Sequence, residues 1–200
     1  MLVLDVGCGE GRRSLYYSER GCKVVAFDLS KDIVKAAEKR LERADFKVDV
    51  IVADAEYIPL VSKSFDLINC VETMQYLPYP EFFLKEAQRV LSSEGQLILH
   101  ALNYFSPLAL KRYFQTFFKI RKHPDVKWFS FVKLKKLLSK YSFQVTDFRC
   151  YIYTIPLFDK FYKKYHFWLR IHEKLEVVLN FSPIMYILPS SFLFKCKKQI

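Results

Sequence analysis

The fold is decided by residues 1–11 at the start of the chain, which read MLVLDVGCGEG. The apolar run Leu2–Val6 has no helical periodicity, which is typical of a buried strand in a parallel sheet. Three glycines at alternate positions follow, and a helical pattern begins at Arg12. Glycine permits a positive φ and lets a ligand approach main-chain atoms closely. The stretch therefore predicts a strand, a tight loop and a helix start, which is the layout of a nucleotide-type binding site.

The spacing of the glycines excludes two common forms of such a site. A dinucleotide-binding loop reads G-x-G-x-x-G and would need a glycine where Arg12 stands. A phosphate-binding P-loop would need Gly-Lys-Ser/Thr, which is also absent. A nicotinamide oxidoreductase, which would use the same sheet and loop, is therefore disfavoured.

With Asp5 two residues before the first glycine, the stretch resembles motif I of the class I S-adenosylmethionine-dependent methyltransferases. The resemblance implies that the loop backbone lines the methionine part of this cofactor and that the carboxylate helps to hold its amino group. Because a sulfonium carries no phosphate, a carboxylate beside the loop is compatible with it. The structural alternative is an ordinary strand-to-helix turn whose glycines serve packing.

Two later aspartates fit the same family. Asp28 ends the predicted strand Lys23–Phe27, where the resemblance implies a carboxylate that accepts both ribose hydroxyls; the alternative is a helix N-cap, a role that Ser30 could equally fill. Residues 53–68, ADAEYIPLVSKSFDLI, resemble the family segment in which an aspartate reaches the adenine amino group. Asp54 is therefore the adenine candidate, and Ala55 would offer its backbone N–H to the ring.

The resemblance also places a substrate-side loop, at residues 72–80, after the predicted strand Phe65–Val71. No catalytic dyad is expected, because a sulfonium is already a good electrophile and the protein mainly has to position the acceptor. His100 is expected to be a core histidine rather than a base. The predicted site consists of the cofactor-binding residues Asp5, Gly7, Cys8, Gly9, Gly11, Asp28, Leu29, Asp54, Ala55 and Val71, and of the substrate-side candidates Glu72, Gln75 and Tyr76.

The fold class that these patterns predict is α/β, with a doubly wound, mostly parallel seven-stranded sheet of Rossmann-like type. The last strand, at residues 190–197, is expected to be antiparallel, and a helical aromatic and basic insertion is expected at about residues 157–181. We expect one methyltransferase domain over residues 1–200, with a cofactor-binding half at 1–102 and a substrate-side half at 103–200. A fifth strand is predicted at Gln96–Ala101, after a turn at Ser92–Gly95.

Relatives of this family usually carry some tens of residues before the first strand, as helices that close over the cofactor. This chain starts within one residue of that strand, so these cap helices are expected to be missing. The sequence is then a fragment, has a misassigned start or uses a shortened pocket.

Charged residues are unevenly distributed between the two halves of the chain. Residues 1–100 contain 13 Lys and Arg against 16 Asp and Glu, whereas residues 101–200 contain 19 against 5 and hold 24 of the 34 aromatic residues. A basic, aromatic half suits RNA, an anionic membrane surface or an acidic substrate. The alternative is an aromatic core surrounded by solvated lysines.

The five cysteines are scattered without metal-ligand spacing, which predicts no metal site and a reducing, cytoplasmic location. Residues 177–194 are uncharged but contain two prolines, so no transmembrane span is expected, although the basic insertion could contact a membrane peripherally. The predicted function is methyl transfer from S-adenosylmethionine to a small-molecule or lipid-like acceptor, in the style of the quinone and sterol branch. The alternatives are an RNA methyltransferase, and a truncated, non-catalytic domain that binds the cofactor or scaffolds a partner.

Overall fold

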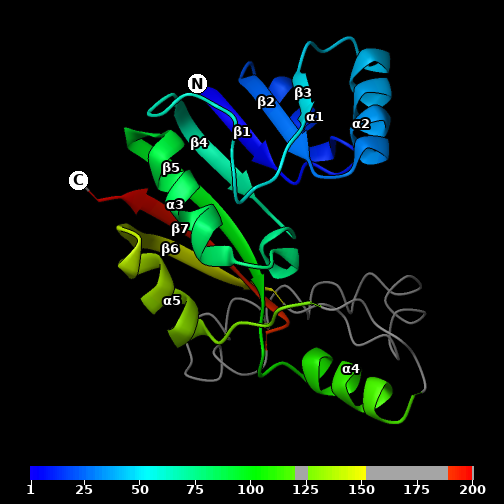
Figure 1. Cartoon of the computed structure of the whole chain (residues 1–200), viewed down its shortest axis with the longest axis vertical. Helices are drawn as coiled ribbons and strands as arrows, with labels where there is room; N and C mark the ends of the chain where they lie inside the picture. The colour runs from blue at the N-terminus through cyan, green and yellow to red at the C-terminus, as the bar shows by residue number, and fades with distance from the viewer. Residues whose placement is uncertain (120–125, 152–188, 200) are drawn as a thin grey trace, which may run out of the picture.

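In a computed structural model of the 200-residue chain, the residues described are 1–119, 126–151 and 189–199. The elements are β1 (Leu2–Val6), α1 (Arg12–Ser18), β2 (Lys23–Asp28), α2 (Lys31–Arg43), β3 (Asp49–Val52), β4 (Phe65–Cys70), the 3₁₀ turn η1 (Met74–Tyr76), α3 (Pro80–Val90), β5 (Leu91–Leu102), α4 (Pro107–Phe117), α5 (Phe131–Lys140), β6 (Phe143–Tyr151) and β7 (Ser191–Lys198). Figure 1 shows their arrangement. The predicted insertion at about 157–181 lies outside the described residues.

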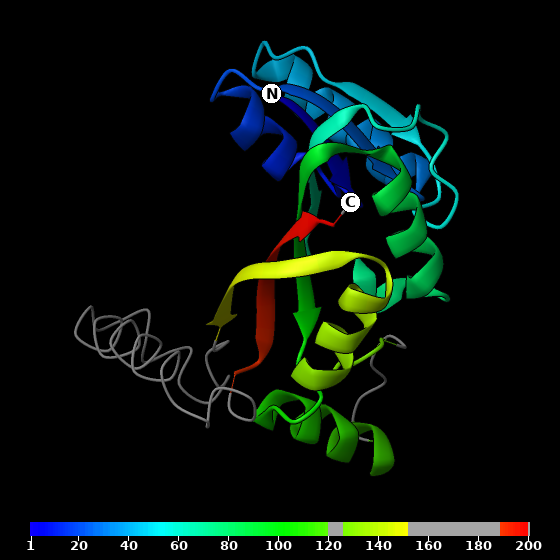
Figure 2. The same ribbon diagram turned by 90° about the vertical axis from the view of Figure 1, so that its left-hand side faces the viewer.

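The strands form one sheet of seven in the order β3-β2-β1-β4-β5-β7-β6. All neighbouring pairs from β3 to β5 are parallel, and β7 runs antiparallel to both β5 and β6. The predicted doubly wound sheet with an antiparallel last strand is therefore confirmed. Figure 2 shows α1 on one side of this sheet and α3 and α5 on the other.

The order of the strands in the sheet reverses at β1, and this reversal indicates where a ligand would bind. The chain moves outward from β1 through β2 to β3 and then returns to β4 on the other side of β1. In open α/β sheets, ligands bind beyond the carboxyl ends of the strands at such a reversal. The glycine loop after β1 lies at this point.

The fifth strand differs from the prediction at its start. It begins at Leu91, directly after α3, and not at Gln96. Its pairing with β4 shifts, because Leu91 lies opposite Phe65 while Gln96 lies opposite Leu67. The predicted turn residues Ser92–Gly95 thus form a bulge within the strand. Gly95 permits it, since a Cβ there would lie 2.7 Å from Leu91 Cδ2.

Aromatic packing accounts for part of the aromatic excess in the second half. The Phe131 ring from α5 lies 5.5 Å from that of Phe192 and 5.3 Å from that of Phe194, both on β7. All three side chains are buried. In contrast, the α4 side chains Tyr113 and Phe117 are well exposed. Some aromatic residues of this half therefore pack in the core, and others lie on the surface.

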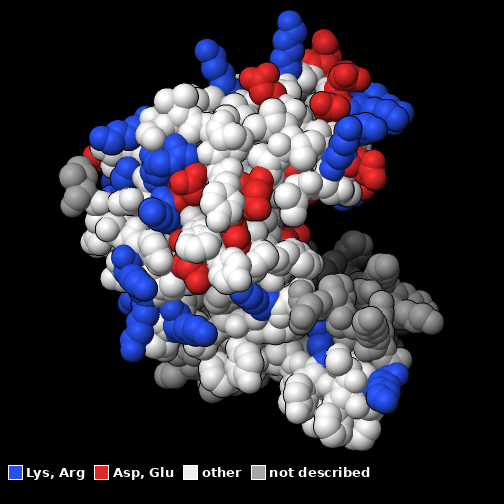
Figure 3. Space-filling view, viewed as in Figure 1, with Lys and Arg blue, Asp and Glu red and all other residues white. Residues whose placement is uncertain are grey.

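Lysines of the second half gather on α5, at Lys133, Lys135, Lys136 and Lys140. Figure 3 shows several Lys and Arg side chains over this helix, at the lower left of the view. Within the described ranges, no helix is long and apolar enough to cross a membrane.

Helix α3 offers a direct test of this packing. Phe83 is fully buried against the sheet, whereas its neighbour Phe82 is 42% exposed. We expect Phe83→Ala to lower the free energy of unfolding by about 3–5 kcal/mol, because it leaves a cavity in the core. Phe82→Ala is the matched control and should cost at most about 1 kcal/mol. Urea denaturation of both variants measures this, and equal losses would contradict the assigned orientation of α3.

Candidate cofactor and acceptor site

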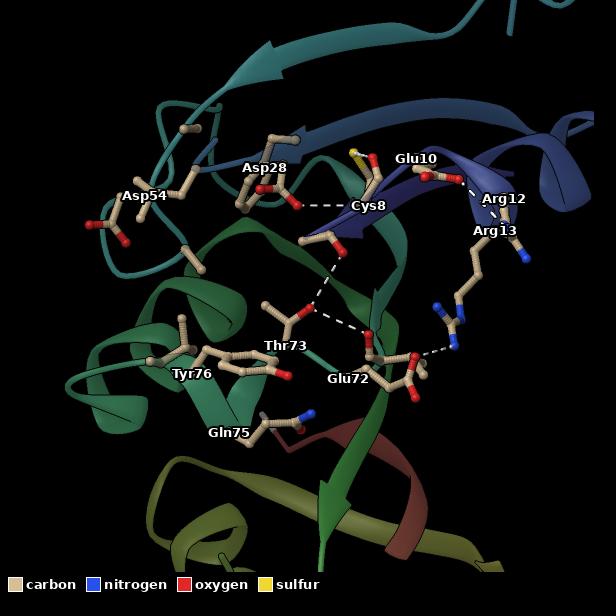
Figure 4. Close-up of a pocket in the computed structure, with 18 of the residues that line it drawn as sticks. Cys8, Glu10, Arg12, Arg13, Asp28, Asp54, Glu72, Thr73, Gln75 and Tyr76 are labelled. Atoms are coloured by element: carbon tan, nitrogen blue, oxygen red, sulfur yellow. Dashed lines mark hydrogen bonds and ion pairs between the residues drawn. The ribbon is translucent and has the colours of Figure 1, made fainter. Parts of the chain in front are cut away.

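A cleft of about 950 Å³ lies at the carboxyl ends of β1 to β4. Every predicted site residue lines it except Asp5 and Gly11. Figure 4 shows Asp28 and Asp54 on one side of the cleft and Gln75 and Tyr76 on the other, with Thr73 between them. Cofactor-side and substrate-side candidates therefore share one continuous cavity.

The glycine loop has the conformation that the sequence required, since Gly7, Gly9 and Gly11 all have φ between +55° and +76°. The three positions nevertheless serve different purposes. Gly9 lines the cleft, and a Cβ on it would meet no atom within 4 Å. Gly11 faces α2 instead, where a Cβ would lie 3.3 Å from that of Ala37. The loop thus leaves open space beside the Gly9 backbone, where a ligand can approach.

Thr73 fastens this loop to the chain after β4. Its hydroxyl lies 3.0 Å from the carbonyl oxygen of Val6, to which it donates, and 3.4 Å from those of Gly7 and Val71. A Cβ on Gly7 would lie 2.2 Å from Thr73 Oγ1, so only glycine admits this contact. Gly7 therefore makes room for a protein side chain as well as lining the cleft.

Asp28 reaches across to the glycine loop. Its carboxylate accepts hydrogen bonds from the Gly9 N–H at 3.1 Å and from the Ser30 N–H at 3.0 Å. The N-cap of α2 is Ser30, whose hydroxyl accepts from the Ile33 N–H. Asp28 is therefore not needed as the cap. Each carboxylate oxygen keeps a lone pair for a hydroxyl donor in the cleft.

The segment after β3 is shaped by two carboxylates. Asp54 lines the cleft and accepts a hydrogen bond from the Glu56 N–H at 2.9 Å. Glu56 itself is buried and accepts from the backbone N–H of Tyr79, just before α3. This second contact fixes the segment against the loop on the substrate side, so that the two halves of the cleft wall are joined.

Asp5 does not reach the cleft. Its buried carboxylate accepts from the Ser14 hydroxyl at 2.6 Å and from the Asn69 amide at 2.8 Å. Burial raises the pKa of this carboxyl above its usual value, and the two hydrogen bonds oppose that rise. Its side chain holds β1, α1 and β4 together, and it is not among the residues that line the cleft.

Charged side chains that the sequence prediction omitted also line the cleft. Arg13, on the first turn of α1, lies 3.5 Å from the Glu72 carboxylate, and Glu72 has a positive φ of 63°. Such a φ is uncommon outside glycine and marks a backbone held by its surroundings. The other omitted lining residues are Glu10, Arg12, Phe27, Ala53, Thr73, Leu77, Pro78, Leu102 and Arg112. Arg112 comes from α4, far along the chain, and no local motif pointed to it.

The residues present fit S-adenosylmethionine. The open space beside Gly9 admits a ligand against the backbone, and Asp28 offers acceptor oxygens for hydroxyl groups. Glu10 and Glu72 are paired with arginines, whereas Asp28 and Asp54 form no ion pair among the described residues, so their carboxylates are the ones electrostatically favourable for a cationic ligand. Phe27 and Ala55 supply apolar surface for a ring system.

Comparison with known proteins agrees with this geometry. Residues 4–99 match the family model described as a methyltransferase domain. A ubiquinone biosynthesis O-methyltransferase from Xanthomonas oryzae is 34% identical over 102 residues, which cover 50% of this chain and 43% of that protein.

Solved structures match over the whole chain. A protein from Bacillus halodurans, described as a candidate methyltransferase, is 25% identical with a TM-score of 0.74, and the match covers 100% of this chain and 93% of that one. A methyltransferase structure from Methanosarcina mazei, described as S-adenosylmethionine-dependent, gives a TM-score of 0.72 at 19% identity, with coverage of 100% and 92%.

Fold, cleft and matches define a class I methyltransferase domain of Rossmann-like type. Residues 4–99 match the methyltransferase family, and the curated relatives of this segment belong to its small-molecule branch. S-adenosylmethionine is the cofactor that this family and fold imply. The matched segment spans 43% of the length of the curated relatives, so their activity is not carried over with the family.

His100 is a buried histidine on β5, as the sequence predicted, and it lies outside this cleft. Burial lowers its pKa to about 4; the nearby Glu72 carboxylate raises it slightly and Arg13 lowers it further. The folded protein therefore prefers a neutral imidazole. Stability from this group is complete above the usual histidine pKa of about 6.5 and is lost as the pH falls towards 4.

We therefore expect wild-type protein to lose about 3 kcal/mol of unfolding free energy through His100 between pH 6.5 and 4, from a pKa difference of roughly 2.5 units. His100→Gln should flatten this part of the pH dependence. Urea denaturation of both proteins across this range measures it. Identical pH profiles would show that His100 takes up its proton as readily in the folded as in the unfolded chain.

Proposed function

We propose that this protein is an enzyme that transfers the methyl group of S-adenosylmethionine to a hydroxyl oxygen of a small-molecule acceptor. The observation that carries the proposal is the single cleft in which Asp28 and Asp54 face Gln75 and Tyr76. One wall has the groups that suit the cofactor, and the other supplies a separate surface for a second molecule.

We propose that different residues on the cofactor side bind different parts of S-adenosylmethionine. The backbone of Gly7–Gly9 would border the methionine part, and Asp28 would accept the ribose hydroxyls. Asp54 would accept the adenine amino group, and the Ala55 N–H would face the ring. Asp5 acts indirectly, by holding the strand that carries the loop.

S-adenosylmethionine supplies an electrophilic methyl group on a sulfonium, which becomes a neutral thioether when a nucleophile takes the methyl group. The protein's part is to hold the acceptor oxygen in line with that carbon and to exclude water, which by itself is a large contribution to rate. The hydroxyl proton of the acceptor passes to solvent. We assign no residue as a general base.

The choice of oxygen and of a small acceptor rests on the relatives, whose description is ubiquinone biosynthesis O-methyltransferase. The acceptor could also be lipid-like, because α4, which contributes Arg112 to the cleft, exposes the aromatic side chains Tyr113 and Phe117. The comparisons give no support to an RNA acceptor or to a non-catalytic domain.

Calorimetric titration with S-adenosylmethionine and S-adenosylhomocysteine tests the cofactor assignment. Gly9→Arg fills the open space in the cleft, and Asp28→Ala removes the proposed ribose acceptor. We expect each variant to weaken binding by at least about tenfold, since a hydrogen bond to a charged group is worth about 1.5–3 kcal/mol. NADH should give no signal.

Two matched controls separate site effects from folding. Gly21 also has a positive φ, of 76°, and open space at its Cβ, but it lies outside the cleft, so Gly21→Arg should leave binding unchanged. Asp32→Ala removes an exposed carboxylate of α2 and should do the same. Equal loss in Gly9→Arg and Gly21→Arg, or no cofactor binding by folded wild-type protein, would refute the proposed cofactor site.

A further inference from the structure

The segment that leads from β3 to β4 supplies Asp54 and Ala55 to the cleft without any regular secondary structure of its own. Across residues 53–64, which the structure describes in full, no residue belongs to a helix or a strand. The backbone groups of such a segment need partners elsewhere in the protein if its cleft residues are to keep one position. The question is therefore which groups hold it.

The partners come from the last turns of α3. The Ile58 N–H donates to Glu86 Oε2 at 3.0 Å, and the Ile58 carbonyl oxygen accepts from Arg89 Nη2 at 2.7 Å. Arg89 Nη1 donates to the carbonyl oxygen of Leu60 at 2.9 Å. Three main-chain groups of the segment are thus held by two side chains that lie three residues apart on one helix.

Glu86 and Arg89 are also fixed to each other. Arg89 Nε lies 2.9 Å from Glu86 Oε1, and Arg89 Nη2 lies 2.7 Å from Glu86 Oε2, so the pair forms two parallel hydrogen bonds. The hydrogen bonds from Arg89 lower the pKa of the Glu86 carboxyl below its usual value, which keeps the pair charged at neutral pH. Charged pairs with this geometry are stronger and more specific in direction than neutral hydrogen bonds. A lysine at position 89 could replace only some of these contacts.

The chain between this anchor and the cleft is short and is held as well. Ile58 and Ala55 are 3% and 6% exposed and belong to the same buried core cluster. Glu56, which lies between them, is buried and accepts a hydrogen bond from the Tyr79 N–H. Asp54, four residues before Ile58, therefore extends into the cleft from a segment that is fixed against α3.

Resting on the proposed function, we propose that Glu86 and Arg89 are positioning residues that hold Asp54 in place for the adenine amino group and so set the preference of the site for adenine. The described lining of the cleft includes neither side chain, so the pair acts through Asp54 and not by touching the ligand. Holding the segment before binding reduces the entropy that is lost when the ligand binds.

Equilibrium binding of two ligands tests this without turnover. S-inosylhomocysteine has an oxygen where S-adenosylhomocysteine has the adenine amino group. We expect wild-type protein to bind S-adenosylhomocysteine at least about tenfold more tightly than S-inosylhomocysteine, a difference of about 1.4 kcal/mol. Arg89→Met should reduce this preference to less than about threefold by weakening S-adenosylhomocysteine alone, and Arg89→Lys should keep part of it.

A double-mutant cycle with Asp54→Ala shows whether Arg89 acts through Asp54. Asp54→Ala alone should remove the preference, because it removes the proposed acceptor of the amino group. If Arg89 positions Asp54, then adding Arg89→Met to Asp54→Ala should change the affinity for S-adenosylhomocysteine by less than about twofold. A further loss as large as that caused by Arg89→Met in the wild-type background would overturn the positioning role.

Three further variants separate positioning from folding, with the melting temperature measured for each. Glu86→Gln removes the charged pair at constant size and should lower the preference in the same direction, so the test stands even if Arg89→Met does not fold. Leu138→Ala opens a cavity in the core under α5 and should lower the melting temperature while the preference is kept. Lys85→Met, at an exposed position of α3, should leave both unchanged.

The outcomes also separate this inference from the proposed function. Binding of S-adenosylhomocysteine without a preference for adenine, or a preference that survives in Arg89→Met and Glu86→Gln, overturns the positioning role and leaves the proposed cofactor site standing. Equal weakening of both ligands in Arg89→Met also overturns it, because the pair would then serve folding alone. If folded wild-type protein binds neither ligand, the proposed cofactor site is refuted, and this inference with it.

Discussion

The buried carboxylate of Asp5 is the constraint on which the cleft depends. It accepts hydrogen bonds from Ser14 on α1 and Asn69 on β4, while Asn69 also accepts one from the hydroxyl of Tyr17. A buried carboxylate without such partners would be costly, so the three elements are held in one arrangement. The glycine loop begins two residues after Asp5, so the same contacts fix the position of the start of the loop.

A second constraint acts on the glycine loop that follows β1. Thr73 can bond to the end of β1 only because Gly7 has no Cβ, and Asp28 can bond to the loop only because the Gly9 N–H points towards β2. The loop is thus fixed from both neighbouring strands. A site preorganised in this way loses little entropy when a ligand binds, which suits a reaction whose main requirement is alignment.

Much of this was predictable from the sequence because the signals are local. The strand, loop and helix of residues 1–18 are encoded by contiguous residues. Asp28 ends β2 and Asp54 follows the end of β3 by two residues, and the positions of both strands follow from periodicity. The role of Asp5 was not predictable, because a carboxylate before a glycine loop reads the same whether it faces a ligand or its neighbours Ser14 and Asn69. The bulge at Ser92–Gly95 depends on pairing with β4, which is a long-range property.

The acceptor side depended on contacts that no local pattern encodes. Gln75 was among the candidates because it follows β4, but the burial of its side chain depends on the folded chain. Arg112 joins the cleft from α4, roughly forty residues further along the chain. Family resemblance is strongest where the chain binds the shared cofactor, whereas acceptor groups differ among relatives and come from whichever elements reach the cleft. The physical consequence is an asymmetry: a motif can identify the cofactor half of such a site, but the acceptor half has to be inferred from the side chains that the folded chain brings to the cleft.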